Sequence, residues 1–245
     1  MSTRGSRTSV VRVAALAATA VLLTGCGVAG TDFQPGAAAQ VNATDISLDT
    51  VDAYTTAFCE AIDSGSFGDV GPVARGELRQ GVSGNLVRKA AAEQFAAEYG
   101  VEPGSYYEQV RTQVADQVAA LPDEVGDALI EVQSADTFVN EVSSRVGEAA
   151  LQREGTETPR PADSLERGLQ IFAGWLEEQQ VELNPVLGVT LDDAGAWAPA
   201  DGSTSVAAST EAVLSTSSPV DAAGQPDPDY TAFVAALPAS QRCGG

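Results

Sequence analysis

Hydrophobic side chains recur at intervals of three and four residues along most of the chain, which is the pattern of helices with one apolar face. Five such stretches predict helices, in chain order at about residues 47–62, 73–99, 105–120, 122–151 and 163–180. Gly100 marks the end of the second helix, and the fourth has a weak point near Ser134. A shorter apolar repeat through Phe233 and Leu237 predicts a last helix that Asp229 caps.

Two short segments follow another pattern, in which apolar and polar residues alternate as they do in strands. Residues 39–46 predict a strand followed by a turn, and residues 181–189 predict a short strand that Pro185 ends. A proline suits the edge of a sheet because it cannot donate a ladder hydrogen bond. We therefore expect a mainly α fold with a small β element, in which five or so helices pack with a strand pair formed by the first and last segments of the domain.

The N-terminal residues do not fit this fold. Three arginines precede an apolar run from Val13 to Leu23, and small residues follow, which is the order of a secretory signal. The run is shorter than the roughly 20 residues that cross a bilayer. Its end, Leu23-Thr24-Gly25-Cys26, resembles the lipobox of bacterial lipoproteins, in which the cysteine is acylated and the preceding peptide is removed. The resemblance implies lipidation of Cys26 and a protein anchored by lipid on the extracytoplasmic face of the cell membrane.

The alternative is a buried apolar helix that ends in a free thiol, which leaves the arginines and the small residues unexplained. With the lipobox, the chain divides into a lipoprotein signal peptide, a lipid-anchored flexible tether, a helical domain, a poorly ordered loop rich in Ser, Thr, Ala and Pro, and a C-terminal helix with a disulfide tail. These parts span residues 1–25, 26–38, 39–200, 201–229 and 230–245.

The charge of the chain is strongly negative. It contains 34 Asp and Glu against 13 Lys and Arg, and removal of residues 1–25 takes away three arginines, which leaves a formal charge of about −24. Such a surface repels nucleic-acid phosphates and anionic lipid headgroups. We therefore expect no nucleic-acid partner, and contact with the membrane through the lipid anchor only.

The residues needed for common catalytic chemistry are missing. The chain has no histidine, which is the commonest general base and metal ligand. The acidic pairs Glu177-Glu178 and Asp192-Asp193 do not lie in a calcium-loop pattern, and neighbours on a helix do not face one another. The only lysine, Lys89, falls on a predicted helix, where a surface charge is the default interpretation. We expect no enzyme, no metal site and no cofactor.

If Cys26 is lipidated, Cys59 and Cys243 remain as a possible pair. Disulfides persist outside the cytoplasmic membrane, so we expect these two cysteines to be joined. The bridge would pin the C-terminal tail to the first helix of the domain. Two free buried thiols are the alternative.

Four segments together resemble a known family. They are Ala39-Gln40-Val41-Asn42-Ala43-Thr44-Asp45-Ile46-Ser47, Ala96-Ala97-Glu98-Tyr99-Gly100-Val101-Glu102-Pro103, Val181-Glu182-Leu183-Asn184-Pro185 and the lipobox. Their order and spacing resemble the N-terminal domain of the SurA and PrsA chaperone family, in the shortened lipoprotein form of actinobacteria. In that family a strand leads into a helical domain, a long helix ends in a similar glycine-valine-x-proline pattern, and a late strand returns to pair with the first.

The resemblance covers about residues 39–191 and implies ATP-independent, chaperone-like binding of unfolded or extended exported polypeptides. Family members often carry a parvulin-type prolyl isomerase domain. This chain has no histidine and no spare stretch long enough for that domain, so isomerase activity should be absent. A domain of this kind on its own could instead be a structural or docking lipoprotein that holds one specific partner in the cell envelope. A small-molecule binding lipoprotein is a weaker alternative, because the chain has no two-lobed pattern.

An extended peptide can lie in an apolar groove or add a strand to a sheet edge. The candidate groove wall is the helical stripe formed by Val82, Leu86, Phe95 and Tyr99. The candidate edge carries Val181 and Leu183. A stripe of this kind is more often simply core, so core packing is the favoured alternative for the four helical residues.

Overall fold

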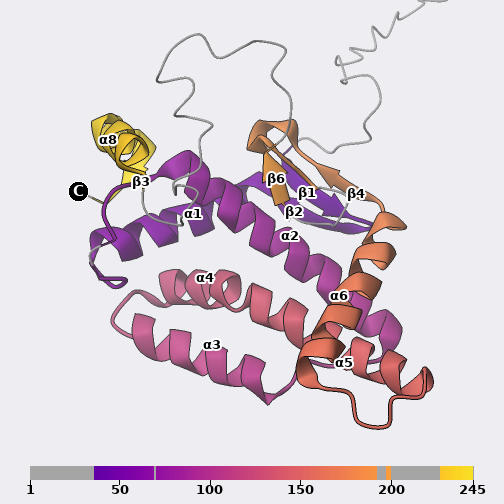
Figure 1. Cartoon of the computed structure of the whole chain (residues 1–245). Coiled ribbons are helices and arrows are strands. Elements are labelled where there is room, and N and C mark those ends of the chain that lie inside the picture. Colours follow the sequence, from indigo (N-terminus) through magenta and orange to yellow (C-terminus); the bar gives the residue numbers. More distant parts are fainter. Residues whose placement is uncertain (1–35, 69, 192–196, 200–226, 245) are drawn as a thin grey trace, which may run out of the picture. The chain divides into compact units, whose positions relative to one another are not determined.

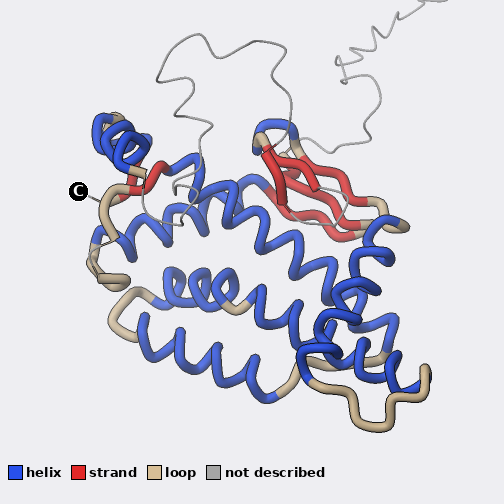
Figure 2. The backbone as a smooth tube through the Cα atoms, in the orientation of Figure 1, coloured by secondary structure: helices blue, strands red, loops and turns tan. Residues whose placement is uncertain are grey.

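Helices dominate the structure, and short antiparallel strands lie beside them (Figures 1 and 2). The structure is a computed structural model that describes residues 36–68, 70–191, 197–199 and 227–244, all within one unit that runs from Phe33 to Gly245. The expected fold class, mainly α with a small β element, is confirmed. The expected signal peptide, Cys26 and most of the loop at 201–229 lie outside the described residues.

The elements follow one another as short strands, a long run of helices, and strands again. Their bounds are β1 (Ala37–Val41), β2 (Thr44–Ser47), α1 (Leu48–Asp63), β3 (Val73–Ala74), α2 (Arg75–Tyr99), α3 (Ser105–Val118), α4 (Asp123–Gln133), α5 (Ala135–Arg153), α6 (Pro161–Glu177), β4 (Val181–Leu183), η1 (Pro185–Leu187), β5 (Val189–Leu191), β6 (Trp197–Pro199), α8 (Pro228–Ala236), η2 (Ala239–Gln241) and β7 (Arg242–Cys243).

Several predicted helix ends are confirmed. The Ser47 hydroxyl accepts a hydrogen bond from the Thr50 backbone N–H at 3.0 Å and so caps α1. Gly100 follows α2 with a φ of 65°, the left-handed conformation in which glycine ends helices without a Cβ penalty. The weak point near Ser134 is the boundary between α4 and α5.

Two expected boundaries are wrong. Asp227, not Asp229, caps α8, and its carboxylate accepts hydrogen bonds from the backbone N–H groups of Asp229 and Tyr230. Pro228 occupies the first position of α8, where proline is favoured, so the cap falls one residue before it. Strand β1 begins at Ala37, inside the segment 26–38 that was expected to be tether, because its backbone already pairs with the segment after α6.

The first and last segments of the helical region pair as the sequence predicts. β1 lies at the centre of a three-stranded sheet of order β2-β1-β4, with Val41 opposite Val181 and Ala39 opposite Leu183. The Asn42 side chain donates to Gln94 of α2 at 2.7 Å and accepts from the Gln180 backbone N–H at 3.1 Å. These bonds tie the β1–β2 turn both to the long helix and to the segment that follows α6.

A second asparagine holds the other end of this pairing. The Asn184 amide donates to the Ala37 carbonyl at 2.8 Å, and its oxygen accepts from the Val186 N–H at 3.0 Å. The larger core lies beneath the sheet and is centred on Phe95, whose ring contacts Phe172 and Trp175 at centroid distances of 5.1 and 5.5 Å. A smaller core around Leu129 joins α1, α3 and α4.

The C-terminal segment is fastened to α1 and α2. Cys59 and Cys243 form the expected disulfide, with their Cα atoms 5.0 Å apart. β7 pairs with β3, and the Gly244 N–H donates to the Asp63 carboxylate at 2.7 Å. The Tyr230 hydroxyl donates to Glu77 at 2.6 Å, and burial together with this carboxylate raises the pKa of the tyrosine.

The closest helix contact in the described structure involves α5 and α6, which cross through small residues. A Cβ placed on Gly147 would lie 1.9 Å from the Ser164 carbonyl oxygen, and one placed on Gly168 would lie 1.8 Å from that of Ser143. Backbone lies directly against backbone here, so neither glycine can carry a side chain without moving a helix. No local sequence pattern predicts this crossing, although both helices carry a serine four residues before the glycine.

Gly147→Ala should lower the free energy of unfolding by about 3 kcal/mol, because the added methyl group meets a backbone oxygen that cannot rotate away. Gly174→Ala on the exposed side of α6 is the matched control. No atom lies within 4 Å of its Cβ position, so alanine should raise the free energy of unfolding by roughly 0.5–1 kcal/mol. Urea unfolding followed by circular dichroism measures both effects. Equal stability of the two variants would contradict the close crossing.

Candidate functional site

The helical stripe considered as a candidate groove wall is mostly core, which was the favoured interpretation. Val82 is 2% exposed and Phe95 is fully buried, so neither can touch a ligand. Helix α2 packs against α1, α4, α5, α6 and β1, and therefore has little apolar surface left to offer. Tyr99 is 41% exposed, while its ring still packs on Phe95. Of the four residues, only Leu86 lines a concave surface.

The expected strand edge is present, but its apolar side chains face the core. β4 pairs with β1 and stands at one end of the sheet order. Val181 and Leu183 are half-buried and pack against the larger core. A ligand at this edge would therefore meet backbone rather than these two side chains.

A different hollow lies at the opposite end of the sheet order, beside β2. It has a volume of about 230 Å³ and is bounded by β2, α1, α2 and α4. We call it the Lys89 groove. Its lining consists of Asp45, Ile46, Thr50, Tyr54, Leu86, Lys89, Ala90, Glu93 and Glu131.

Lys89 is buried, which corrects the expectation of a surface charge. The residue is 8% exposed, and its ammonium lies 2.5 Å from Glu131 Oε1 and 3.0 Å from Glu93 Oε1. It also lies 5.7 Å from the centre of the Phe138 ring. Burial lowers the pKa of Lys89, but hydrogen bonds to Glu131 and Glu93 outweigh it, so the pKa is raised and the side chain is charged at neutral pH.

Negative charge exceeds positive charge around this ammonium. Both carboxylates that contact Lys89 remain partly exposed, with 53% of the Glu93 side chain and 33% of the Glu131 side chain in contact with solvent. The pKa of Tyr54 is raised, first by burial and then by the negative charge of Glu131, while Lys89 acts in the opposite direction. The groove is therefore acidic at its mouth.

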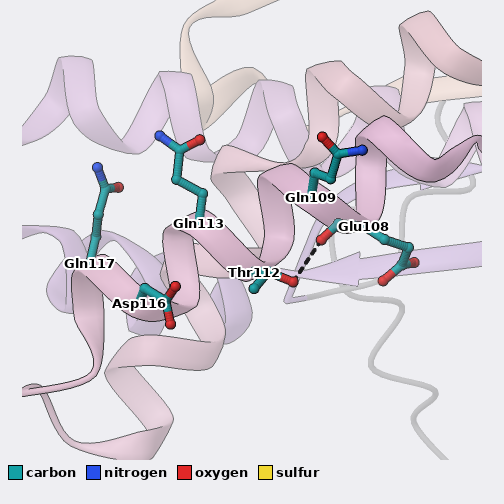
Figure 3. Close-up of a pocket in the computed structure, with 6 residues that line it drawn as sticks. All are labelled: Glu108, Gln109, Thr112, Gln113, Asp116 and Gln117. Atoms are coloured by element: carbon teal, nitrogen blue, oxygen red, sulfur yellow. Dashed lines mark hydrogen bonds between the residues drawn. The ribbon is translucent and has the colours of Figure 1, made fainter.

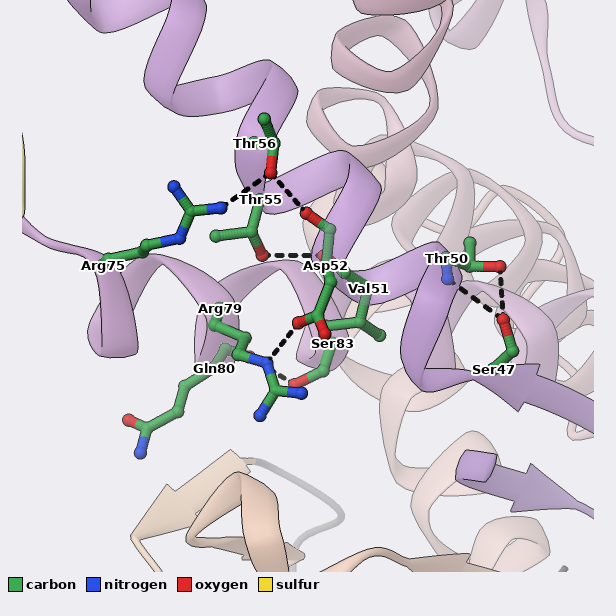
Figure 4. Close-up of polar contacts among 10 residues, drawn as sticks. All are labelled: Ser47, Thr50, Val51, Asp52, Thr55, Thr56, Arg75, Arg79, Gln80 and Ser83. Atoms are coloured by element: carbon green, nitrogen blue, oxygen red, sulfur yellow. Dashed lines mark hydrogen bonds and ion pairs between the residues drawn. The ribbon is translucent and has the colours of Figure 1, made fainter. Parts of the chain in front are cut away.

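Polar contacts join α1 and α2, two of the elements that bound the groove (Figure 4). Arg79 donates to the Asp52 carboxylate at 2.6 Å, and Arg75 donates to the Thr56 hydroxyl at 2.6 Å. At the N-terminus of α1, the Ser47 cap starts the helix directly after β2.

The two other hollows offer less chemistry. One lies on the outer face of α3, and its described lining is six exposed polar residues of that one helix (Figure 3): Glu108, Gln109, Thr112, Gln113, Asp116 and Gln117. The other, of about 810 Å³, lies between the end of α2 and α5, where Arg145 and Glu148 stand beside small residues such as Ala97. Of these three hollows in the described part of the chain, only the Lys89 groove combines a buried charge with walls from four elements.

One local feature of the sequence points to this site. Lys89 follows Leu86 by three residues and therefore lies on the same helical side as the apolar stripe, with Glu93 one turn further on. Glu131 is 42 residues away, and nothing local predicts that it approaches Lys89. For that reason the site is not predictable from local sequence patterns.

No group of three or more acidic or cysteine side chains suited to a metal ion occurs among the described residues. No described helix has both the length and the apolar character needed to cross a bilayer. Comparison with known proteins assigns no family to the chain: no family model matches it, and neither a curated protein nor a solved structure matches it significantly.

Lys89→Met should lower the free energy of unfolding at pH 7 by about 2 kcal/mol, because Glu131 and Glu93 lose the cation between them. Since the pKa of Lys89 is raised in the folded protein, its contribution is complete at pH 7 and disappears above about pH 10.5. The difference between the variant and the wild type should therefore shrink at high pH. Urea unfolding at pH 7 and pH 11 measures it.

The matched control for this prediction is Arg160→Met, which removes an exposed ion pair with Asp163. Such pairs contribute little, so the control should unfold like the wild type. If Lys89→Met also unfolds like the wild type at pH 7, the lysine is not the electrostatic centre of the groove.

Proposed function

We propose that the chain is a lipid-anchored extracytoplasmic protein that binds extended or unfolded polypeptides, without ATP and without isomerase activity. The observation that carries the proposal is a sheet edge beside a groove. β2 pairs with β1 on one side only among the described strands, and it contributes Asp45 and Ile46 to the lining of the Lys89 groove. Strand addition with a side-chain pocket next to it is a general mode of peptide recognition.

The topology supports the same proposal. β1 leads into the helices α1–α6, and β4 returns to pair with β1, which is the arrangement that the resemblance to the SurA and PrsA chaperones implies. The missing histidine and the lack of room for a further domain in the helical region support binding without isomerase activity. The lipobox-like segment that ends at Cys26 supports the anchor.

Photo-crosslinking in intact cells tests the binding function. A benzoylphenylalanine at Asp45, on the edge strand, should capture many exported polypeptides, because an unpaired strand edge binds a polypeptide through backbone hydrogen bonds, which any sequence can form. The same probe at Thr231, on the exposed side of α8, is the control. One dominant crosslinked protein would favour a docking lipoprotein instead. Capture at Asp45 no greater than at Thr231 would contradict polypeptide binding at this edge.

Cys26→Ser tests the anchor. The serine cannot form the thioether to a diacylglyceryl group, so radiolabelled fatty acid should no longer enter the protein and the membrane fraction should lose it. A single acyl chain holds a protein only weakly, whereas two hold it stably, so the loss should be nearly complete. Unchanged membrane retention and unchanged labelling of the variant would exclude Cys26 as the lipidated residue.

A further inference from the structure

We propose that the Lys89 groove selects an arginine side chain of the extended polypeptide that lies along β2. This inference rests on the proposed function and specifies its ligand. The groove lies directly beside the strand edge, so a polypeptide paired with β2 would pass its mouth and present one side chain to it.

The size of the groove suits a single side chain. Sites for free small molecules and cofactors usually occupy about 300–1,000 Å³. The Lys89 groove has about 230 Å³ and is open to solvent on one side, which leaves room for one long residue. Its lining contains both apolar and polar groups, as a long side chain with a charged tip requires.

The charge of the groove selects a cation. Two carboxylates, those of Glu93 and Glu131, face the single ammonium of Lys89, and both remain partly exposed, so they can also contact a ligand. The side chain of Asp45 forms no hydrogen bond or ion pair with any other residue that the structure describes, and it adds a third negative charge at the mouth. These carboxylates would repel an incoming anion, and an uncharged side chain would leave the excess negative charge of the groove unbalanced.

The shape of the charged group favours arginine. A guanidinium is planar and donates several hydrogen bonds at once, so it can reach two carboxylates in a fixed geometry and can stack on an aromatic ring. Glu93 and Glu131 stand on different helices, and Tyr54 lines the same groove. Ile46, Leu86 and Ala90 give apolar surface against which the arginine stem can lie.

A pair of peptides tests this selection. One is an extended, fluorescently labelled peptide of alternating valine and threonine with a single central arginine, and the other carries citrulline, which has the same shape without the charge. Fluorescence anisotropy should show about tenfold tighter binding of the arginine peptide at low salt, with a smaller ratio in 0.5 M NaCl. Equal affinity of the two peptides overturns the inference and leaves the proposed function standing. Binding of neither peptide overturns both.

Two glutamate variants test whether the preference for arginine arises in the groove. Glu131→Gln and Glu93→Gln should each reduce the preference for arginine over citrulline to about threefold or less, while the citrulline peptide keeps its affinity. Glu148→Gln, in the hollow between α2 and α5, is the matched control and should keep the full preference. Glu93 is the more exposed of the two carboxylates, so its variant keeps the test valid if Glu131→Gln fails to fold. A preference that survives both substitutions overturns the inference.

Discussion

The structure depends on the pairing of β1 with the strand that follows the helices. β1 precedes the helical region and β4 comes after it, and their ladder brings together residues about 140 positions apart in the chain, such as Val41 and Val181. Loop closure over such a distance costs conformational entropy, which a ladder of three residue pairs does not offset alone. Asn42 and Asn184 add side-chain hydrogen bonds at the two ends of the ladder, and the larger core seals one face of the sheet. The position of β2, and with it the Lys89 groove, follows from this closure.

Local patterns predicted the helices well because each one needs only its own apolar face to be recognised. The helix boundary at Ser134 and the end of α2 at Gly100 are also predictable from local sequence. A small polar residue and a left-handed glycine each change the backbone conformation at their own position. The pairing of the two strands was predicted from the resemblance and from their alternation. The cap of α8 was misplaced because Pro228 shifts the helix start, and β1 began earlier than expected because alanines give no clear alternation.

The site was harder to predict because it is made of contacts between distant residues. The stripe Val82, Leu86, Phe95 and Tyr99 was correctly recognised as one side of a helix, but a periodic pattern does not tell whether a helix side faces core or ligand. Lys89 is the opposite case, because the sequence predicts an exposed residue and the structure buries it. A lysine in an acidic protein is expected at the surface, and its burial here depends on Glu93, one turn along the helix, and on Glu131, which approaches it only in the folded structure. The crossing at Gly147 and Gly168 likewise depends on two helices whose contact no local pattern specifies.

Pairing with other segments covers the backbone at both ends of the described unit. Unpaired strand backbone is therefore left at only a few sheet edges. At the C-terminus, the Cys59–Cys243 disulfide and the β3–β7 pair fasten the tail to α1, and in the chain-entropy model a bridge over 184 residues stabilises by roughly 5 kcal/mol at most. At the N-terminal side, β1 is covered on both edges by β2 and β4. The outer edge of β2 is left beside a groove that contains a buried lysine, and the ion pair between Arg79 and Asp52 joins α1 and α2, two of the elements that bound it. An edge held in this way is preorganised. A polypeptide that paired with it would lose its own conformational entropy, whereas the protein would lose little.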